Sequence, residues 1–212
     1  MRRVPITALL VALIATAALG EDRARQLADD VMQAAGIEAW NDVRRIRFTF
    51  NVENDGKTVM SAVHDWDRVA GTDTVRWQDK TVTVNLASPG EDADAKAAFA
   101  RWTNDAYWLL APLKLADGGL KLAHLGTREK EGRTYEILHL SFDQVGLTPG
   151  DQYDLYVHPE SKRIEWWDYM PAPEKRTSFT WEGYQTFRGV TLSTEHRTGN
   201  RRIFFTDISV EK

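Results

Sequence analysis

The sequence predicts an α+β protein that is mainly β, built as an antiparallel sheet with two or three helices on one side. Apolar and polar residues alternate along most of the chain from Ile46 to Val210, which is the spacing of strands with one buried face. Only two segments, residues 22–35 and 92–105, carry apolar residues at helical spacing. Turn-forming residues separate the alternating segments, so successive strands are expected to run antiparallel.

The first half of the chain is predicted to be one helix followed by a meander of strands. Leu27, Val31 and Met32 share one face of the helix, and Gly36 follows it as a stop. The expected strands cover residues 46–52, 60–66, 74–78 and 81–86, with a hairpin turn at residues 54–56.

A second predicted helix interrupts the meander in mid-chain. Ala95, Phe99 and Trp102 lie on one face of residues 92–105, and an apolar segment broken by Pro112 follows. Strands are then expected at residues 121–127, 134–142, 152–158, 163–169, 178–187, 190–196 and 202–210, with a turn at 149–150 among those between them. We find no repeat or linker, so the chain is expected to form a single domain.

The N-terminus has the pattern of a secretory signal peptide. Arg2 and Arg3 precede an apolar segment, and Ala18 and Gly20 place small residues before a cleavage point ahead of Glu21. The expected organisation is a signal peptide at residues 1–20 and a mature domain at 21–212, located in a bacterial periplasm or outside the cell. The alternative interpretation of the segment is an uncleaved anchor helix.

Composition excludes several classes of protein. The 212 residues contain no cysteine, which rules out disulfides, thiolate metal sites and a cysteine nucleophile. Residues 21–212 contain 25 basic and 31 acidic residues, so the mature chain gives no electrostatic reason to bind nucleic acid. After residue 20, no apolar segment has the length needed to cross a bilayer.

A search for catalytic residues finds no recognisable constellation, and no enzyme activity is expected. No serine has a nucleophile-elbow context, and no glycine-rich loop precedes a helix. The histidines lack the spacing of a helical zinc site, so no metal is expected, although ligands from distant strands could still converge. They are His64, His124, His139, His158 and His196. The aspartates Asp65, Asp67, Asp143, Asp151, Asp154 and Asp168 lie mostly near strand ends and turns, where solvated aspartate is common.

Large aromatic side chains are the unusual feature of the composition. The chain has eight tryptophans, and two or three helices would leave part of the apolar sheet face uncovered, which favours a cavity for an apolar ligand. The predicted walls are Phe48, Phe50, Trp66, Trp77 and Trp102, and the predicted mouth is Trp108, Leu109 and Leu110. Ordinary core packing is the alternative, with the last three residues fastening the inserted helix to the sheet.

The order of elements resembles the LolA/LolB-like superfamily of bacterial lipoprotein carriers. Local similarities to secreted relatives are Ala39-Trp40 and the segments at 107–112, 149–153 and 155–157. This resemblance implies an unclosed half-barrel with helices covering its concave side, an acyl-chain cavity under a helical lid, and no cofactor. It also implies a lid-holding arginine, for which Arg68 is the nearest match, although Val69 stands where the family has proline. The alternative for Arg68 is a solvated residue at a strand end.

The resemblance implies a periplasmic carrier or binding protein for lipid acyl chains or lipoproteins. Its expected partners are those acyl chains and an envelope receptor protein, and a monomer is expected. Two other functions stay open: an envelope sensor of the same fold, and a small-molecule enzyme with His64 and Tyr135 as candidate polar groups.

Overall fold

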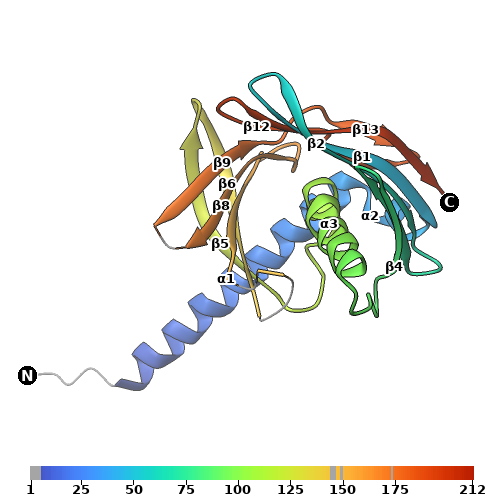
Figure 1. The fold of residues 1–212 in the computed structure, drawn as a ribbon. Coiled ribbons are helices and arrows are strands. Elements are labelled where there is room, and N and C mark those ends of the chain that lie inside the picture. Colours follow the sequence, from blue (N-terminus) through green and yellow to red (C-terminus); the bar gives the residue numbers. More distant parts are fainter. Residues whose placement is uncertain (1–5, 144–146, 149, 173) are drawn as a thin grey trace, which may run out of the picture.

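The computed structural model describes residues 6–143, 147–148, 150–172 and 174–212, with side chains from Gly20 onward. The start of the predicted signal peptide, residues 1–5, and Pro149 of the predicted turn at 149–150 lie outside the described residues. Two antiparallel sheets stand as facing walls around α3 (Figure 1). The sheets are not closed into a barrel, and the predicted fold class is confirmed.

The first sheet has six strands in the order β12-β13-β1-β2-β3-β4. They are β1 (Arg45–Asn54), β2 (Lys57–Asp67), β3 (Thr72–Trp77), β4 (Lys80–Asn85), β12 (Glu195–Thr198) and β13 (Arg201–Glu211). Its four N-terminal strands form a meander, as their alternation predicts, and the last strand of the chain returns beside β1. The C-terminal strands therefore complete a sheet that the first half of the chain begins.

The second sheet has five strands in sequential order. They are β5 (Leu120–Lys130), β6 (Arg133–Phe142), β7 (Gln152–Val157), β8 (Ile164–Ala172) and β9 (Lys175–Thr180). The two sheets meet where β9 approaches β12: the Arg197 backbone N–H donates to Thr180 Oγ1 at 3.0 Å, and the His196 ring lies 3.3 Å from the Thr180 carbonyl oxygen. The curved surface thus continues from one sheet to the other.

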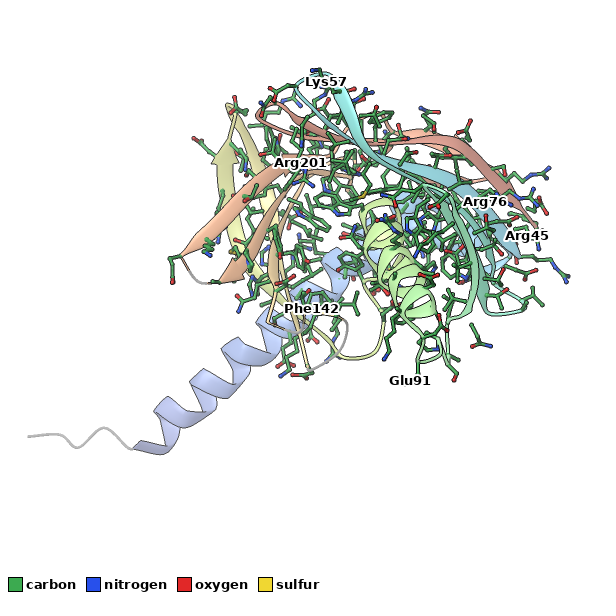
Figure 2. The ribbon with its side chains drawn as sticks, in the orientation of Figure 1. Arg45, Lys57, Arg76, Glu91, Phe142 and Arg201 are labelled. Atoms are coloured by element: carbon green, nitrogen blue, oxygen red, sulfur yellow. The ribbon has the colours of Figure 1, made fainter. Side chains whose placement is uncertain are left out.

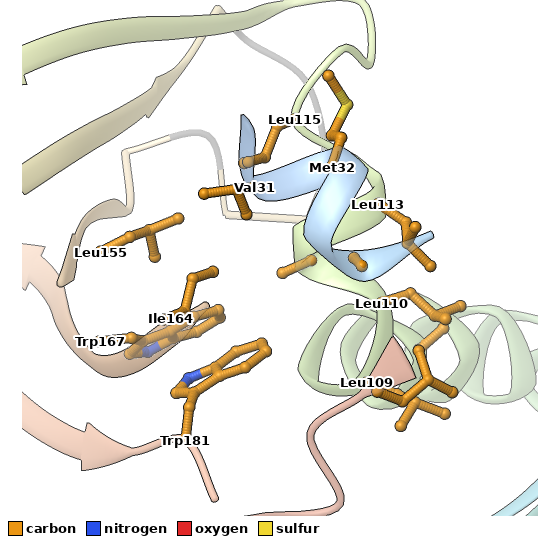
Figure 3. Packing of buried hydrophobic residues seen from close by; sticks show 14 of the residues in the cluster. Val31, Met32, Leu109, Leu110, Leu113, Leu115, Leu155, Ile164, Trp167 and Trp181 are labelled. Atoms are coloured by element: carbon orange, nitrogen blue, oxygen red, sulfur yellow. The ribbon is translucent and has the colours of Figure 1, made fainter. Parts of the chain in front are cut away.

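Over the described residues, three α-helices and one short 3-10 helix accompany the sheets. They are α1 (Ile6–Ala35), α2 (Ile37–Asn41), α3 (Ala93–Leu110) and η1 (Ala111–Leu113). The N-terminal part of α1 extends beyond the sheets (Figure 1), whereas its C-terminal part buries Leu27 and Val31 in the main core. Figure 3 shows Val31 and Met32 in that core with Leu113 and Leu155. Among the described residues, none of the helices combines the length and apolarity needed to span a membrane.

Four predicted elements differ from the observed ones. The helix predicted at 22–35 begins at Ile6, and the helix predicted at 92–105 continues to Leu110, because Ala106, Leu109 and Leu110 keep the buried helical spacing and Pro112 stands just beyond it. The strands predicted at 178–187 and 190–196 are each divided. Their inner halves form a separate hairpin of β10 (Gln185–Phe187) and β11 (Val190–Leu192), and Gly183, at φ 63°, lies between β9 and β10.

A close backbone approach explains the glycine between α1 and α2. Gly36 has φ 83°, and an added Cβ would collide with the carbonyl oxygen of Gly189 in the β10–β11 turn. We therefore expect Gly36→Ala to lower the free energy of unfolding by more than about 3 kcal/mol, because it combines an unfavourable φ with a backbone clash. Urea denaturation of the purified variant measures this change.

Gly56→Ala is the matched control, since Gly56 has φ 75° in a hairpin turn with open space around it. Gly56→Ala should lower the free energy of unfolding by only about 1 to 2 kcal/mol, because it imposes the unfavourable φ without a clash. Equal destabilisation by the two substitutions would contradict the role assigned to the contact with Gly189.

Candidate functional site

The candidate site consists of two adjoining cavities between α3 and the sheets. The first has a volume of about 300 Å³ and is lined by Thr103, Asn104, Tyr107, Trp108, Phe142, Leu147, Thr148, Asp151, Tyr153, Trp167 and Tyr169. The second has a volume of about 230 Å³ and is lined by Trp66, Trp102, Thr103, Ala106, Tyr107, Leu110, Lys114, Asp117, Gly118, Leu120 and Phe142. Thr103, Tyr107 and Phe142 line both, so the two volumes are neighbours.

α3 takes its position partly from apolar packing on the first sheet. Asp92 begins the helix by accepting a hydrogen bond from the Ala95 backbone N–H at 2.9 Å. Ala98 and Phe99 then pack against Val75 and Trp77 of β3. The helix face that carries Thr103 and Tyr107 therefore points toward the cavities.

A buried charged cluster fixes the same helix to the first sheet. The His64 ring on β2 is fully buried, with Nδ1 2.7 Å from the Asp73 carboxylate and Nε2 3.1 Å from the Asp105 carboxylate of α3. Burial lowers the pKa of His64, but the hydrogen bonds to Asp105 and Asp73 outweigh it and raise the pKa to about 9. The imidazolium is therefore the stable form at neutral pH.

Aromatic contacts hold the other side of α3 against the second sheet. The Trp108 ring stacks on Trp167 of β8 with centroids 4.8 Å apart, and Trp167 meets Tyr153 of β7 at 4.6 Å. Tyr153 in turn stacks on Tyr169, its partner across the strand pair, at 5.4 Å. Phe142, labelled in Figure 2, completes this lining at the end of β6. Leu147, 51% exposed, lies at the rim of the first cavity.

Four of the eight predicted ligand-binding residues line the cavities. Trp108 lines the first cavity, and Trp66, Trp102 and Leu110 line the second. The other four are buried in the cores and line neither cavity: Phe48, Phe50, Trp77 and Leu109. Phe48 stacks on the ring of His64 at 4.7 Å, so its position supports the charged cluster.

Several lining residues were not predicted, chiefly Tyr107, Phe142, Tyr153, Trp167 and Tyr169. A signal for three of them was present in the alternation of β7 and β8, where Tyr153, Trp167 and Tyr169 fall on the inward face with buried Leu155. Burial raises the pKa of the Tyr107 and Tyr153 hydroxyls above their usual range. These phenols are therefore neutral hydrogen-bonding groups.

Arg68 directly follows β2 in the sequence. In space, its side chain lies beside the end of α2 and contacts the turn that follows that helix. Its Nη1 is 2.6 Å from both the Trp40 and the Val43 carbonyl oxygens, and its guanidinium lies 4.1 Å above the Trp40 ring. Both carbonyls belong to α2 and its turn, and not to α3. Trp40 is also in edge contact with Trp66, which connects this arginine to the lining of the second cavity.

The two polar residues weighed for catalysis do not converge. His64 is enclosed in the first sheet, whereas Tyr135 belongs to a separate cluster on the second sheet and donates to Glu165 at 2.8 Å. Another histidine, His196, is buried between Trp108 and Trp181, and burial lowers its pKa to about 3. Within the part of the chain that the structure describes, no three histidine or acidic side chains are placed to hold a metal ion.

Comparisons with known proteins support the architecture. No protein-family model matches the chain, and no curated protein matches its sequence. Among solved structures, a DUF1329 family protein from Desulfovibrio piger aligns with a TM-score of 0.52 at 10% identity, over 89% of this chain and 93% of its own. A LolA superfamily protein from Nitrosomonas europaea aligns with a TM-score of 0.50 at 10% identity, over 87% and 94%.

A third structure is a domain from Vibrio parahaemolyticus described as an outer membrane lipoprotein-sorting protein. It aligns with a TM-score of 0.52 at 9% identity, over 91% of this chain and 94% of its own. The chain therefore has a LolA-like fold, the architecture that the sequence resemblance implied.

The charged cluster gives a testable pH dependence. Because the pKa of His64 rises from 6.5 to about 9 on folding, its contribution to stability is complete below pH 6.5 and is lost as the pH rises through about 9. We expect the free energy of unfolding to fall by on the order of 3 kcal/mol across this window. Urea denaturation at a series of pH values measures it.

His64→Gln should be less stable at neutral pH and should lack this decrease. His158→Gln is the control, because the His158 ring accepts hydrogen bonds from the Glu160 and Ser161 backbone N–H groups and lies outside the buried cluster. A His64→Gln variant whose stability declines with pH as steeply as that of the unchanged protein would show that the assignment is wrong.

Proposed function

We propose that this protein is a periplasmic carrier or binding protein that holds the acyl chains of lipids or lipoproteins in the two cavities beneath α3. The observation that supports the proposal most directly is the lining, in which aromatic side chains from α3, β7 and β8 surround the first cavity. Apolar cavities with a few polar groups are the usual form of a small-molecule site. A LolA-like fold is compatible with this use but does not by itself fix function.

The energetics suit a ligand that must be released. Burying a chain of about fourteen methylenes at about 0.8 kcal/mol each gives on the order of 11 kcal/mol of gross driving force. Lost translational and rotational freedom together with side-chain ordering oppose this by about 4 to 15 kcal/mol. The net affinity is therefore modest and depends on a few contacts, as a carrier requires.

The proposal assigns no catalytic role and no cofactor to the chain. The polar side chains around the cavities serve to orient a ligand, and the solved structures of similar fold include a lipoprotein-sorting domain. In this proposal the protein is a monomer, its ligands are acyl chains, and its protein partner is an envelope receptor.

Arg68 is proposed to hold the segment that borders the second cavity. By donating to the Trp40 and Val43 carbonyls it fixes the end of α2, and Trp40 then contacts Trp66 in the lining. In this arrangement the arginine acts as a lid-holding residue through α2 and Trp66.

The proposed location requires removal of residues 1–20. The mature chain is expected to begin at Glu21, because Ala18 and Gly20 are the small residues placed for signal peptidase. N-terminal sequencing of protein recovered from the periplasm of a Gram-negative host tests this. A membrane-bound chain that still begins at Met1 would instead support the anchor interpretation.

Filling the cavities should weaken ligand binding without unfolding the protein. Thr103 is half-buried and lines both cavities, so Thr103→Phe places a ring in the space that a ligand would occupy. We expect the affinity for the neutral apolar dye N-phenyl-1-naphthylamine to fall at least about tenfold, a loss of about 1.4 kcal/mol. Dye fluorescence on titration measures the affinity.

Ala97→Phe is the matched control, because Ala97 is an exposed residue of the same helix. It should bind the dye like the unchanged protein, and both variants should keep the β-rich circular dichroism spectrum. Undiminished dye binding by folded Thr103→Phe would refute the proposed site.

A further inference from the structure

The first cavity contains one charged side chain, Asp151, among its described lining residues. Asp151 is only 8% exposed and lies just before β7. Its carboxylate lies close enough to the Tyr153 and Tyr169 phenols to contribute, after burial, to the raised pKa of both. A carboxylate has about four acceptor positions, so Asp151 can accept a hydrogen bond from a ligand.

Two other polar side chains of the lining, Thr103 and Asn104, donate hydrogen bonds to groups of the protein. Thr103 Oγ1 donates to the Phe99 carbonyl oxygen at 2.9 Å, and Asn104 Nδ2 donates to Asp105 at 2.8 Å. Their oxygens keep unused acceptor capacity beside Asp151. The Tyr107 hydroxyl and the second Nδ2 proton of Asn104 are neutral donors in the same lining, so the Asp151 carboxylate is the one charged group among the described lining residues.

Positive charge that could receive an anion is absent from the described lining of this cavity, which includes no lysine, arginine or histidine. Trp167 Nε1 is a buried donor without a partner, but an indole N–H is neutral. In the second cavity, Lys114 is already paired with Asp117 at 2.6 Å. An anionic head group would thus meet Asp151 without a compensating cation, which is unfavourable away from bulk water.

We propose that the first cavity selects amphiphiles whose polar end donates hydrogen bonds and carries no negative charge, such as alcohols, amides or amines, over fatty carboxylates. This inference rests on the proposed acyl-chain function and adds the class of head group. Asp151 is the specificity-determining residue: it accepts the donor of a suitable ligand and repels a carboxylate.

Three ligands with the same chain length test the inference: dodecanol, dodecylamine and dodecanoate. Each is titrated at neutral pH into the complex of the protein with N-phenyl-1-naphthylamine. We expect the alcohol and the amine to displace the dye at concentrations about tenfold lower than the carboxylate does. Comparison of alcohol with amine shows whether a neutral donor suffices or a cation is preferred.

Asp151→Asn removes the charge with little change in shape. It should strengthen the binding of dodecanoate and weaken that of dodecylamine, so the concentrations at which the two ligands displace the dye should become more similar. Asp79→Asn makes the same change of charge at an exposed residue of the turn between β3 and β4, which lines neither cavity, and should leave the order of the ligands unchanged. If Asp151→Asn does not fold, the order measured with the unchanged protein decides the matter.

The outcomes separate this inference from the proposed function. Dye binding with equal displacement by the three ligands, or with dodecanoate strongest, would overturn the head-group selectivity and leave the acyl-chain site intact. No dye binding by the unchanged protein would overturn both.

Discussion

The buried cluster of His64 with Asp73 and Asp105 is the interaction on which the position of α3, and therefore both cavities, depends. Replacing such a cluster with apolar residues can be neutral or stabilising, but removing one partner leaves an uncompensated buried charge. Asp105 can meet the His64 ring only when α3 has one particular rotation about its axis. With Asp105 turned toward the first sheet, Thr103 and Tyr107 face the cavities.

The two sides of α3 contact the sheets in different ways. Toward β3 and β4 of the first sheet the helix packs closely, with Ala98 and Phe99 in an apolar cluster near the charged one. Toward the second sheet, large rings meet edge to face or stacked, and the first cavity lies beside these rings. The stacked pair of Trp108 and Trp167 therefore borders a cavity, whereas Trp77 fills its surroundings.

Strand alternation predicted the meander correctly because each of these strands has one face toward the core. Helical spacing likewise placed α3, and only its end was wrong, since the apolar residues at 107–110 continue the helix until Pro112 interrupts it. The separation of the β10–β11 hairpin from β9 and β12 was not predicted because its residues also alternate. Alternation does not show which sheet a strand joins.

Four of the predicted cavity residues line the cavities and four are in the cores, and the difference has a physical reason. The sequence by itself determined that the protein is mainly β, that a helix is inserted in mid-chain, and that more aromatic side chains face inward than the helices cover. Periodicity reports that a side chain points inward. It does not report whether the side chain meets another ring or an empty space.

Only the tertiary structure decided whether an inward side chain meets another ring or a cavity, because this depends on pairs of residues far apart in the sequence. Trp108 lies on Trp167, and Asp105 reaches His64, and neither pairing leaves a mark in the local pattern. The same holds for Asp151, which as a sequence feature is an aspartate beside a turn. Its burial in the first cavity, beside the Tyr153 and Tyr169 phenols, arises only when β7 and β8 pair beneath α3.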